Sequence, residues 1–326
     1  MNIPAPTPLA AALAHIEPFR PKGIGLAEPT ALCPIGLEDF LTRPFPFREM
    51  VCAPWLPVSG LAMLYAPRGV GKTHVALALA YAVASGGRFL KWHAPRPRRV
   101  LVIDGEMPAA VLQERLLAIS EGSTLKPPSD DYLRILASDL EPNGLPDLSS
   151  PEGQLRYGQI LDLADLIIID NLSTLCRSGR ENEAESWLPV QSWALAQRRA
   201  NRSVLFIHHC GKGGAQRGTS RKEDVLDSVV SLRRPEDYSP AEGARFEVHF
   251  EKSRGFTGTD AEPFEAALTI NGWAMRNLNE ALEDRVTALR EDGLTQREIA
   301  TEIGKSLGTV NAILKKAQAK KSHAPD

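Results

Sequence analysis

A loop suited to binding phosphate lies between Leu61 and Ala84, where the sequence reads LAMLYAPRGVGKTHVALALAYAVA. An apolar run precedes the loop and a helical pattern follows it, so backbone N–H groups and the first helical turn would face an anion. In the pattern G-x-x-x-x-G-K-[ST], the lysine, here Lys72, reaches the β- and γ-phosphates, and the hydroxyl, here of Thr73, coordinates magnesium. Ala66 replaces the first glycine of this pattern, which predicts a slightly altered turn rather than a loss of binding. The predicted nucleotide-binding residues are Pro67, Arg68, Gly69, Val70, Gly71, Lys72, Thr73 and His74.

Acidic and histidine side chains end three further apolar runs, which read RVLVIDGEMP, LIIIDN and SVLFIHHCGKGG. Asp170 ends a run that would be buried, and a buried carboxylate is costly unless it meets a cation, which predicts a magnesium ligand. Glu106 follows the strand that ends at Asp104 and could orient a water molecule as a general base. Capping of the next helix is the alternative role for Glu106. His208 and His209 would point to opposite faces, which argues against a metal pair, and one of them could contact a γ-phosphate.

The order of these elements predicts the fold class. Runs rich in β-branched residues at 99–106, 165–171 and 203–209 are separated by helical patterns at 108–119, 153–163 and 184–200. This alternation predicts an α/β core with a mostly parallel sheet and helices on both faces. After Asp224, the segments DSVVSLRR, ARFEVHFEK and FEAALTINGWAMR are predicted to extend the sheet with antiparallel strands. We therefore predict an arm at 1–50, either poorly ordered or packed on a neighbouring subunit, an α/β domain at 51–276 and a small all-helical domain at 279–326.

Composition argues against several classes of protein. The 326 residues carry a formal net charge of −2, so any affinity for nucleic acid would come from local basic patches. The cysteines are scattered without a C-x-x-C pair, which argues against a zinc site or a disulfide framework and fits a reducing compartment. The sequence shows neither a signal-peptide pattern nor a run of about 18 apolar residues. We therefore expect a cytoplasmic protein with no membrane partner.

The set of motifs APRGVGKT, VIDGEMP, LIIIDN and FIHHCGKGG resembles the RecA-type ATPases. Within them it resembles the RepA-type hexameric replicative helicases of plasmids, over roughly residues 50–275. The resemblance implies a RecA-like P-loop core that forms a ring and hydrolyses ATP, with Mg²⁺, at subunit interfaces. It also implies that Lys72 and Thr73 belong to the P-loop, that Glu106 is the catalytic carboxylate and that Asp170 is the Walker B residue. His209 matches the polar residue at the end of the sensor strand, and the missing first glycine departs from the family pattern.

Two cations, Lys252 and Arg254, alternate in FEKSRGFTG at the end of a predicted strand, so their side chains would lie on one face. The pattern K-x-R-G-x-T-G resembles the paired basic fingers of DnaB-like helicases. This resemblance implies that both cations reach the ATP of a neighbouring subunit and neutralise charge on its γ-phosphoryl oxygens. The alternative is an ordinary basic edge strand that discourages aggregation.

A glycine-rich basic segment, GKGGAQRGTSRKED, follows the third of the apolar runs. In RecA-like rings the loop at this position faces the central channel, so the resemblance implies contacts to the backbone of single-stranded DNA. A mobile surface loop is the alternative. The cations that would make the contacts are Lys212, Arg217, Arg221 and Lys222.

The segment 292–310, DGLTQREIATEIGKSLGTV, predicts two short helices joined by a glycine turn. Thr295 and Glu298 form a capping box, Gly304 ends the first helix, and Ser306 is placed to cap the second. This spacing resembles the helix-turn-helix of sigma-like and LuxR-like DNA-binding domains. A helical protein-interaction tail is the alternative. The predicted DNA contacts are Thr309, Asn311, Lys315 and Lys316.

Two functions fit these patterns. The first is an ATP-driven hexameric helicase or translocase that threads single-stranded DNA through a central channel during replication of a plasmid or mobile element. The second is an ATP-regulated DNA-binding regulator or helicase loader, which grips a duplex through the C-terminal unit without unwinding it. A KaiC-like signalling ATPase is a third possibility, and it would not need the basic loop.

Overall fold

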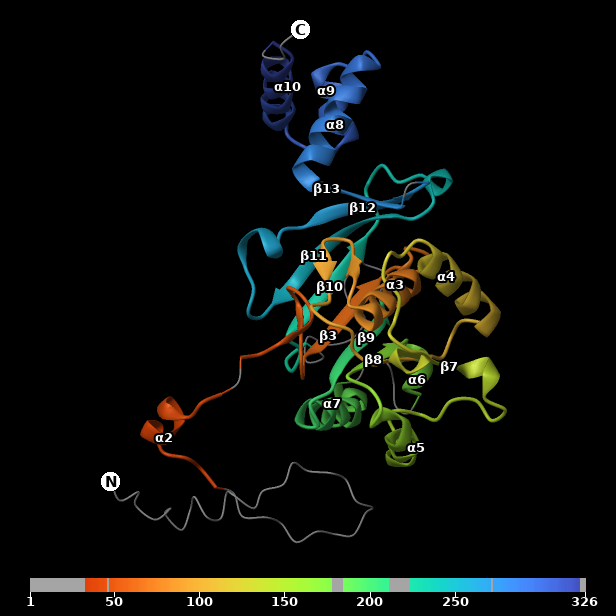
Figure 1. Ribbon diagram of the computed structural model, residues 1–326. Helices are drawn as coiled ribbons and strands as arrows, with labels where there is room; N and C mark the ends of the chain where they lie inside the picture. Colours follow the sequence, from red (N-terminus) through yellow and green to blue (C-terminus); the bar gives the residue numbers. More distant parts are fainter. Residues whose placement is uncertain (1–32, 46, 178–183, 211–222, 271, 323–326) are drawn as a thin grey trace.

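A nine-stranded sheet forms the centre of the protein in the part of the chain that the structure describes (Figure 1). The structure is a computed structural model that describes residues 33–322 except 46, 178–183, 211–222 and 271. The strand order is β13-β12-β11-β10-β3-β9-β8-β6-β7, in which the strands from β10 to β7 run parallel and the other three are added antiparallel. The strands are β3 (Leu61–Ala66), β6 (Val100–Asp104), β7 (Leu133–Ala137), β8 (Leu166–Asp170), β9 (Ser203–His209), β10 (Ser228–Arg233), β11 (Arg245–Ser253), β12 (Phe264–Thr269) and β13 (Gly272–Asn277).

Helices cover both faces of this sheet because successive side chains of a strand point to opposite faces. On β3, Ala62 and Leu64 belong to the core shared with α3 and α4, whereas Leu61 and Met63 belong to the core shared with α5, α6 and α7. The helices are α3 (Lys72–Ser85), α4 (Ala109–Glu121), α5 (Pro151–Leu161), α6 (Leu172–Leu175) and α7 (Ala184–Arg199). The helices thus cover the faces of the sheet, and the loops after the parallel strands begin at its carboxyl edge.

The predicted fold class is confirmed, and the differences lie at the sheet edges. β10 is antiparallel to β11 but parallel to β3, so it continues the parallel part of the sheet. The segment after 263 forms two strands, the β12–β13 hairpin. The parallel edge strand β7 was not predicted, because LRILA is too short to show periodicity. Two small hairpins were also missed, β1 (Met50–Cys52) with β2 (Leu56–Pro57), and β4 (Arg88–Phe89) with β5 (Trp92–His93).

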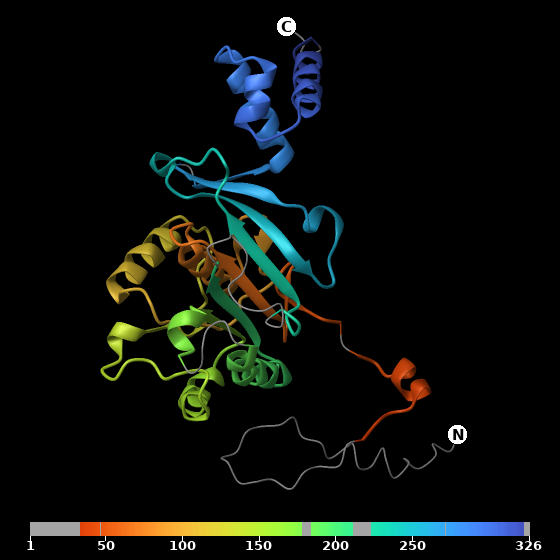
Figure 2. The same ribbon diagram turned by 180° about the vertical axis from the view of Figure 1, so that it is seen from behind.

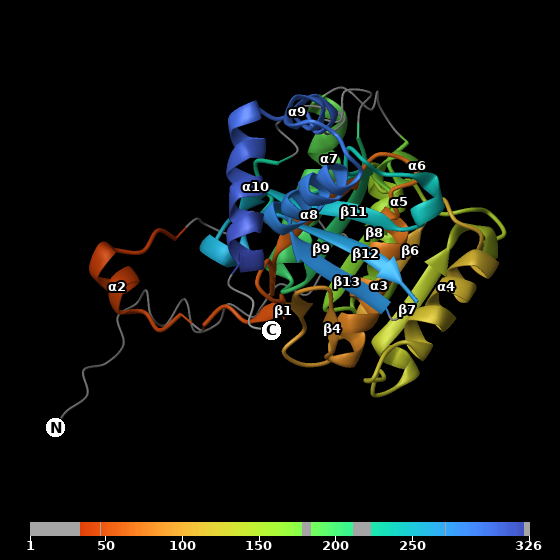
Figure 3. The ribbon, with the colours of Figure 1, turned by 90° about the horizontal axis from the view of Figure 1, so that it is seen from above.

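Two segments extend from this core. Helix α2 (Leu37–Thr42) precedes β1 and stands away from the body (Figures 1 and 3). At the other end of the chain, α8 (Leu278–Glu291), α9 (Gln296–Glu302) and α10 (Leu307–Ser322) form a separate unit beyond the β12–β13 hairpin (Figure 2). Val286, Ile299, Ile303, Val310 and Leu314 make its core. Within the described residues, every helix is too short or too polar to cross a membrane.

Candidate nucleotide-binding site

The phosphate-binding loop joins β3 to α3. Gly69 and Gly71 have φ angles of 78° and 105°, in the left-handed region that glycine adopts without strain. Ala66, which stands where the motif has a glycine, is the last residue of β3 and pairs with His209. Alanine fits there because the chain is still a strand, so the substitution leaves the glycine turn intact. The N–H groups of the first turn of α3 have no helical partners and are free to bind an anion.

Two of the predicted nucleotide contacts have side chains that point elsewhere. Val70 is buried in the core on the α3 side of the sheet. The ring of His74 lies 5.8 Å from that of Trp273, and both line a cavity of about 790 Å³ along α3. Burial lowers the pKa of His74, so the imidazole is neutral at pH 7. Contacts from Val70 and His74 to a phosphate would therefore come from their backbone N–H groups.

Two buried carboxylates, Asp104 and Asp170, lie side by side at the carboxyl ends of β6 and β8. Oδ1 of Asp104 accepts hydrogen bonds from the backbone of the next turn, whereas its Oδ2 and both oxygens of Asp170 have no partner among the described residues. Burial, and then the charge of Asp104, raise the pKa of Asp170 to about 7, while Thr73 and Lys72 act in the opposite direction. A cation would restore the charged form. An unsatisfied carboxylate beside the Thr73 hydroxyl therefore fits a magnesium ion.

Glu106 is held at the rim of the same site. A Cβ on Gly105 would lie 2.6 Å from Oγ1 of Thr174, so a residue larger than glycine would clash there, directly before Glu106. Nδ2 of Asn171 donates to Oε2 of Glu106, and Nε2 of His209 lies 3.3 Å from that Nδ2 and 3.4 Å from that Oε2. Burial lowers the pKa of His209. The Glu106 side chain stays 42% exposed, so water can reach the carboxylate.

The structure brings the predicted residues Lys72, Thr73, Glu106, Asp170 and His209 together at one edge of the sheet. It adds two residues that sequence reasoning missed. Asn171 directly follows Asp170, so its position at the end of a buried strand was a usable signal. Nη2 of Arg234 donates to the backbone oxygen of Gly69 at 3.2 Å, and only the parallel pairing of β10 with β3 brings it there. Arg68 is exposed on the same loop.

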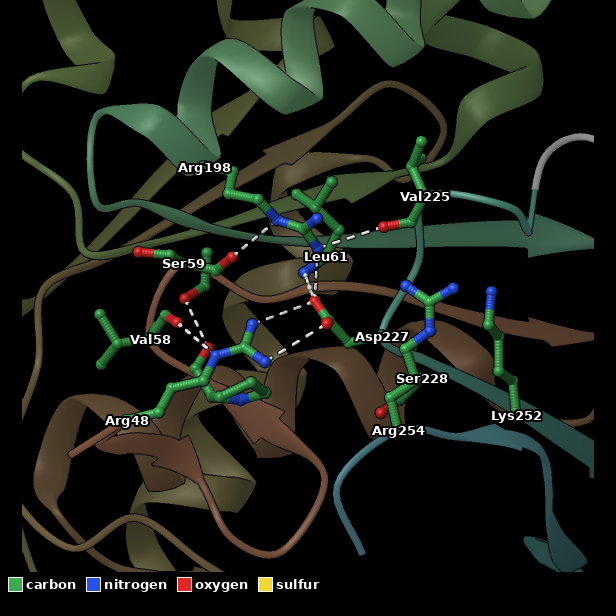
Figure 4. Close-up of polar contacts among 12 residues, drawn as sticks. Arg48, Val58, Ser59, Leu61, Arg198, Val225, Asp227, Ser228, Lys252 and Arg254 are labelled. Atoms are coloured by element: carbon green, nitrogen blue, oxygen red, sulfur yellow. Dashed lines mark hydrogen bonds and ion pairs between the residues drawn. The ribbon is translucent and has the colours of Figure 1, made fainter. Parts of the chain in front are cut away.

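The cations Lys252 and Arg254 lie at the opposite end of the strands (Figure 4). Across β10, Lys252 of β11 lies at the same level as Met63 of β3. Ser253 lies at the level of Ala62, and Arg254 is the next residue. The phosphate loop begins only after Ala66. At roughly 3.3 Å per residue, Arg254 is about 13 Å or more short of its own loop along the sheet.

The predicted DNA contacts divide into two groups. Lys212, Arg217, Arg221 and Lys222 lie outside the described residues. In the C-terminal unit, Lys315 is exposed, whereas Lys316 forms an ion pair with Glu283 of α8. Thr309 shares a hydrogen bond of 2.9 Å with Ser306 at the start of α10, and Asn311 is half-buried. The capping box of Thr295 and Glu298 is present as predicted.

Two family models match parts of this sequence. Residues 28–215 match the family model of an AAA domain, and residues 287–320 match a winged helix-turn-helix DNA-binding model. A solved structure of a KaiC-like protein from the archaeon Pyrococcus horikoshii OT3 is similar at 14% identity and a TM-score of 0.46, covering 68% of this chain and 90% of that one. Among curated proteins, none matches the sequence. Because the first model matches more than half of the chain, the protein belongs to the AAA domain family of P-loop ATPases, and it carries a helix-turn-helix DNA-binding unit at its C-terminal end.

Proposed function

We propose that the protein is a hexameric ATP-dependent DNA helicase or translocase that acts in the replication of a plasmid or mobile element. ATP is hydrolysed between subunits, and single-stranded DNA passes through the channel of the ring. The observation that carries the proposal is the separation of Lys252 and Arg254 from the phosphate loop of their own subunit. A cation pair that lies away from the phosphate loop of its own subunit suits the nucleotide of a neighbour.

The reaction at each site is transfer of the γ-phosphoryl group to water. Lys72 neutralises charge on the β- and γ-phosphates, and Thr73 and Asp170 would hold a magnesium ion, which would supply further positive charge. Glu106 orients the attacking water and accepts its proton. Asn171 and His209 hold Glu106 in that position. The remaining charge on the γ-phosphoryl oxygens is neutralised by Lys252 and Arg254 of the next subunit, which makes turnover depend on assembly.

An apolar arm and an apolar groove at opposite sides of the subunit support head-to-tail assembly. Phe40, Phe45 and Phe47 of the arm are exposed, Phe47 to 92%. A groove of about 400 Å³ lies between α4 and the edge strand β7, and its lining includes Leu112, Leu116, Leu117, Leu133 and Ile135. The arm leaves the body on the side away from α4 and β7 (Figures 1 and 3). We infer that the arm of one copy occupies the groove of the next, a heterologous contact that closes into a ring.

Light scattering tests this contact. Phe47→Asp and Leu117→Asp change exposed side chains on the two sides of the contact, so both variants should fold and both should dissociate the assembly. Leu155→Asp on α5, where the leucine is similarly exposed, is the matched control and should leave the mass unchanged. An assembly that survives both changes would remove the arm from the interface.

Mixing two inactive variants tests the shared ATP site. Lys72→Ala removes a P-loop, and Arg254→Ala removes a finger. In a one-to-one mixture, about a quarter of interfaces join an intact P-loop to an intact finger, so part of the ATP turnover should return. If each subunit used its own Arg254, mixing would restore nothing.

The match to a winged helix-turn-helix model favours a second candidate, an ATP-regulated regulator or loader that binds duplex DNA. Strand displacement by the full chain, together with ATP turnover stimulated by single-stranded DNA, supports the helicase. Tight duplex binding that weakens in Lys315→Glu, without strand displacement, supports the regulator.

A further inference from the structure

Another buried carboxylate, that of Asp227, lies outside the ATP site, directly before β10 (Figure 4). Its Oδ2 accepts hydrogen bonds from the backbone N–H of Leu61 at 2.9 Å and from Nη2 of Arg198 at 2.5 Å. Arg48 adds bonds of 3.4 Å and 3.3 Å to the two carboxylate oxygens. The backbone oxygen of Asp227 accepts from the N–H of Arg254 at 2.9 Å. One residue therefore ties β3, α7 and the segment before β1 to the strand end that carries the fingers.

The chain just before Asp227 contacts the finger side chains directly. We call residues 223–225 the return leg, because they lead back into β10. Nζ of Lys252 donates to the backbone oxygen of Glu223, and Nη2 of Arg254 donates to that of Asp224 at 3.4 Å. Arg198 also donates to the backbone oxygen of Val225, the last residue of the leg, at 3.1 Å. The two fingers thus rest on carbonyl groups whose position is set by the Asp227 cluster.

The contacts of Lys252 and Arg254 to backbone carbonyl groups are weak enough to be exchanged for contacts to a phosphate. A backbone carbonyl is a neutral acceptor, and phosphate oxygens bind Lys and Arg more strongly because they are charged. Long cationic side chains lose up to about 2 kcal/mol of rotamer entropy when they are fixed, so partial ordering beforehand lowers the cost of reaching a phosphate. Lys252 and Arg254 lie two residues apart at the end of β11, and burial and then the charge of Arg254 lower the pKa of Lys252.

We propose that Asp227 is a positioning residue that fixes the return leg and, through its carbonyl groups, aims Lys252 and Arg254 at the nucleotide of the neighbouring subunit. The inference depends on the proposed sharing of the ATP site. When the fingers move to a phosphate, the return leg loses the hydrogen bonds that they donate.

A purely structural role for Asp227 makes a different prediction, and the protein contains a matched control. Glu265 on β12 is similarly buried, and its carboxylate also pairs with two arginines, Arg245 and Arg276. That cluster lies three strands away from β3 in the sheet, and the ion-pair partners of Glu265 are Arg245 and Arg276 rather than the fingers. Glu265→Gln should therefore lower stability much as Asp227→Asn does, while ATP turnover in the assembled protein stays normal.

A double-mutant cycle on ATP turnover in the full-length protein tests the role. Asp227→Asn retains an acceptor for Leu61 and should lower kcat roughly 10- to 100-fold with little change in KM, because misplaced groups act in the transition state. Combined with Lys252→Ala and Arg254→Ala together, it should add little further loss, since Asp227 acts through both fingers. Multiplicative losses in the combined variant, or normal kcat in Asp227→Asn, would overturn the inference.

The cycle also separates this inference from the proposed function. Normal turnover by Arg254→Ala alone would reject the shared site itself. A defective Arg254→Ala with a normal Asp227→Asn would reject only the positioning role. Should Asp227→Asn fail to fold, Arg198→Gln replaces it in the same cycle, because Arg198 bonds both the Asp227 carboxylate and the return leg.

Discussion

Buried carboxylates occupy both ends of the parallel strands, and the two ends satisfy them differently. At the carboxyl end, Asp170 and one oxygen of Asp104 have no hydrogen-bond partner within the described residues. At the amino end, Asp227 has two arginines and a backbone N–H. Burying a carboxylate without a partner is costly, so such a group persists where a ligand completes it. The comparison therefore separates carboxylates suited to binding a cation from a carboxylate whose partners are supplied by the protein itself.

The largest effect is expected at Glu106, a partly exposed carboxylate at the carboxyl end of the strands. Glu106→Gln keeps the hydrogen-bonding shape but removes the general base, so we expect kcat to fall by about 10²–10⁴. Nucleotide binding and Tm should stay near the wild-type values, because Glu106 is not needed for folding. Turnover by the purified variant at the wild-type rate would remove Glu106 from the reaction; helix capping would not explain its place, because α4 has no side-chain cap.

The next effect concerns Asn171, which holds Glu106 and also caps α6. Asn171→Ala should lower kcat roughly 10- to 100-fold, since Glu106 loses its donor. Thr174→Ala weakens the same capping box without removing the contact to Glu106, and it should lower Tm with little loss of kcat. Equal kcat losses in both variants would mean that only the fold of α6 matters.

The sharpest test of the comparison is the sign of a stability change in the absence of nucleotide and magnesium. Asp227→Asn should lower the free energy of unfolding by about 1–3 kcal/mol, because two arginines lose their counter-charge; half of the Arg48 side chain is exposed, which limits the loss. Asp170→Asn should raise it, because an unsatisfied buried acid is replaced by a neutral amide.

Magnesium and nucleotide should reverse the second result. In thermal unfolding, MgATP should raise the Tm of the wild type and raise the Tm of Asp170→Asn less, because the variant holds the metal poorly. If Asp170→Asn is less stable than the wild type without ligands, the carboxylate has a structural partner and the comparison fails.

The smallest effect is expected at an exposed carboxylate in the C-terminal unit. The N–H of Thr295 donates to Oε2 of Glu298 at 2.7 Å and lowers the pKa of this carboxyl. A lowered pKa means that the stabilisation exists above the ordinary pKa of glutamate and is lost as pH falls through the lowered value. Glu298→Gln should slightly reduce hydrogen-exchange protection of α9 at pH 7, and the difference from the wild type should disappear in acid. Glu302→Gln on the same helix is the control, and an equal loss there would exclude the capping box.

Several features could be predicted from local sequence because their causes are local. The glycine loop, the first helix after it and the three strands 100–104, 166–170 and 203–209 follow from nearby residues. So does the capping box of the C-terminal unit. The edge strand β7 could not be predicted, because five residues with mixed burial carry little periodicity. The groove between α4 and β7 was missed for the same reason.

The sequence by itself determined which residues can do chemistry: the order of strand, glycine loop and helix, and the acids that end apolar runs. Tertiary structure alone decided which distant residues meet them. The parallel pairing of β10 with β3 places Arg234 beside Gly69 and puts Arg254 at the far end. Arg48 and Arg198 meet Asp227 although they are 179 and 29 residues away in the chain. Such contacts depend on strand order and register, which arise from packing of the whole sheet rather than from any short stretch of sequence.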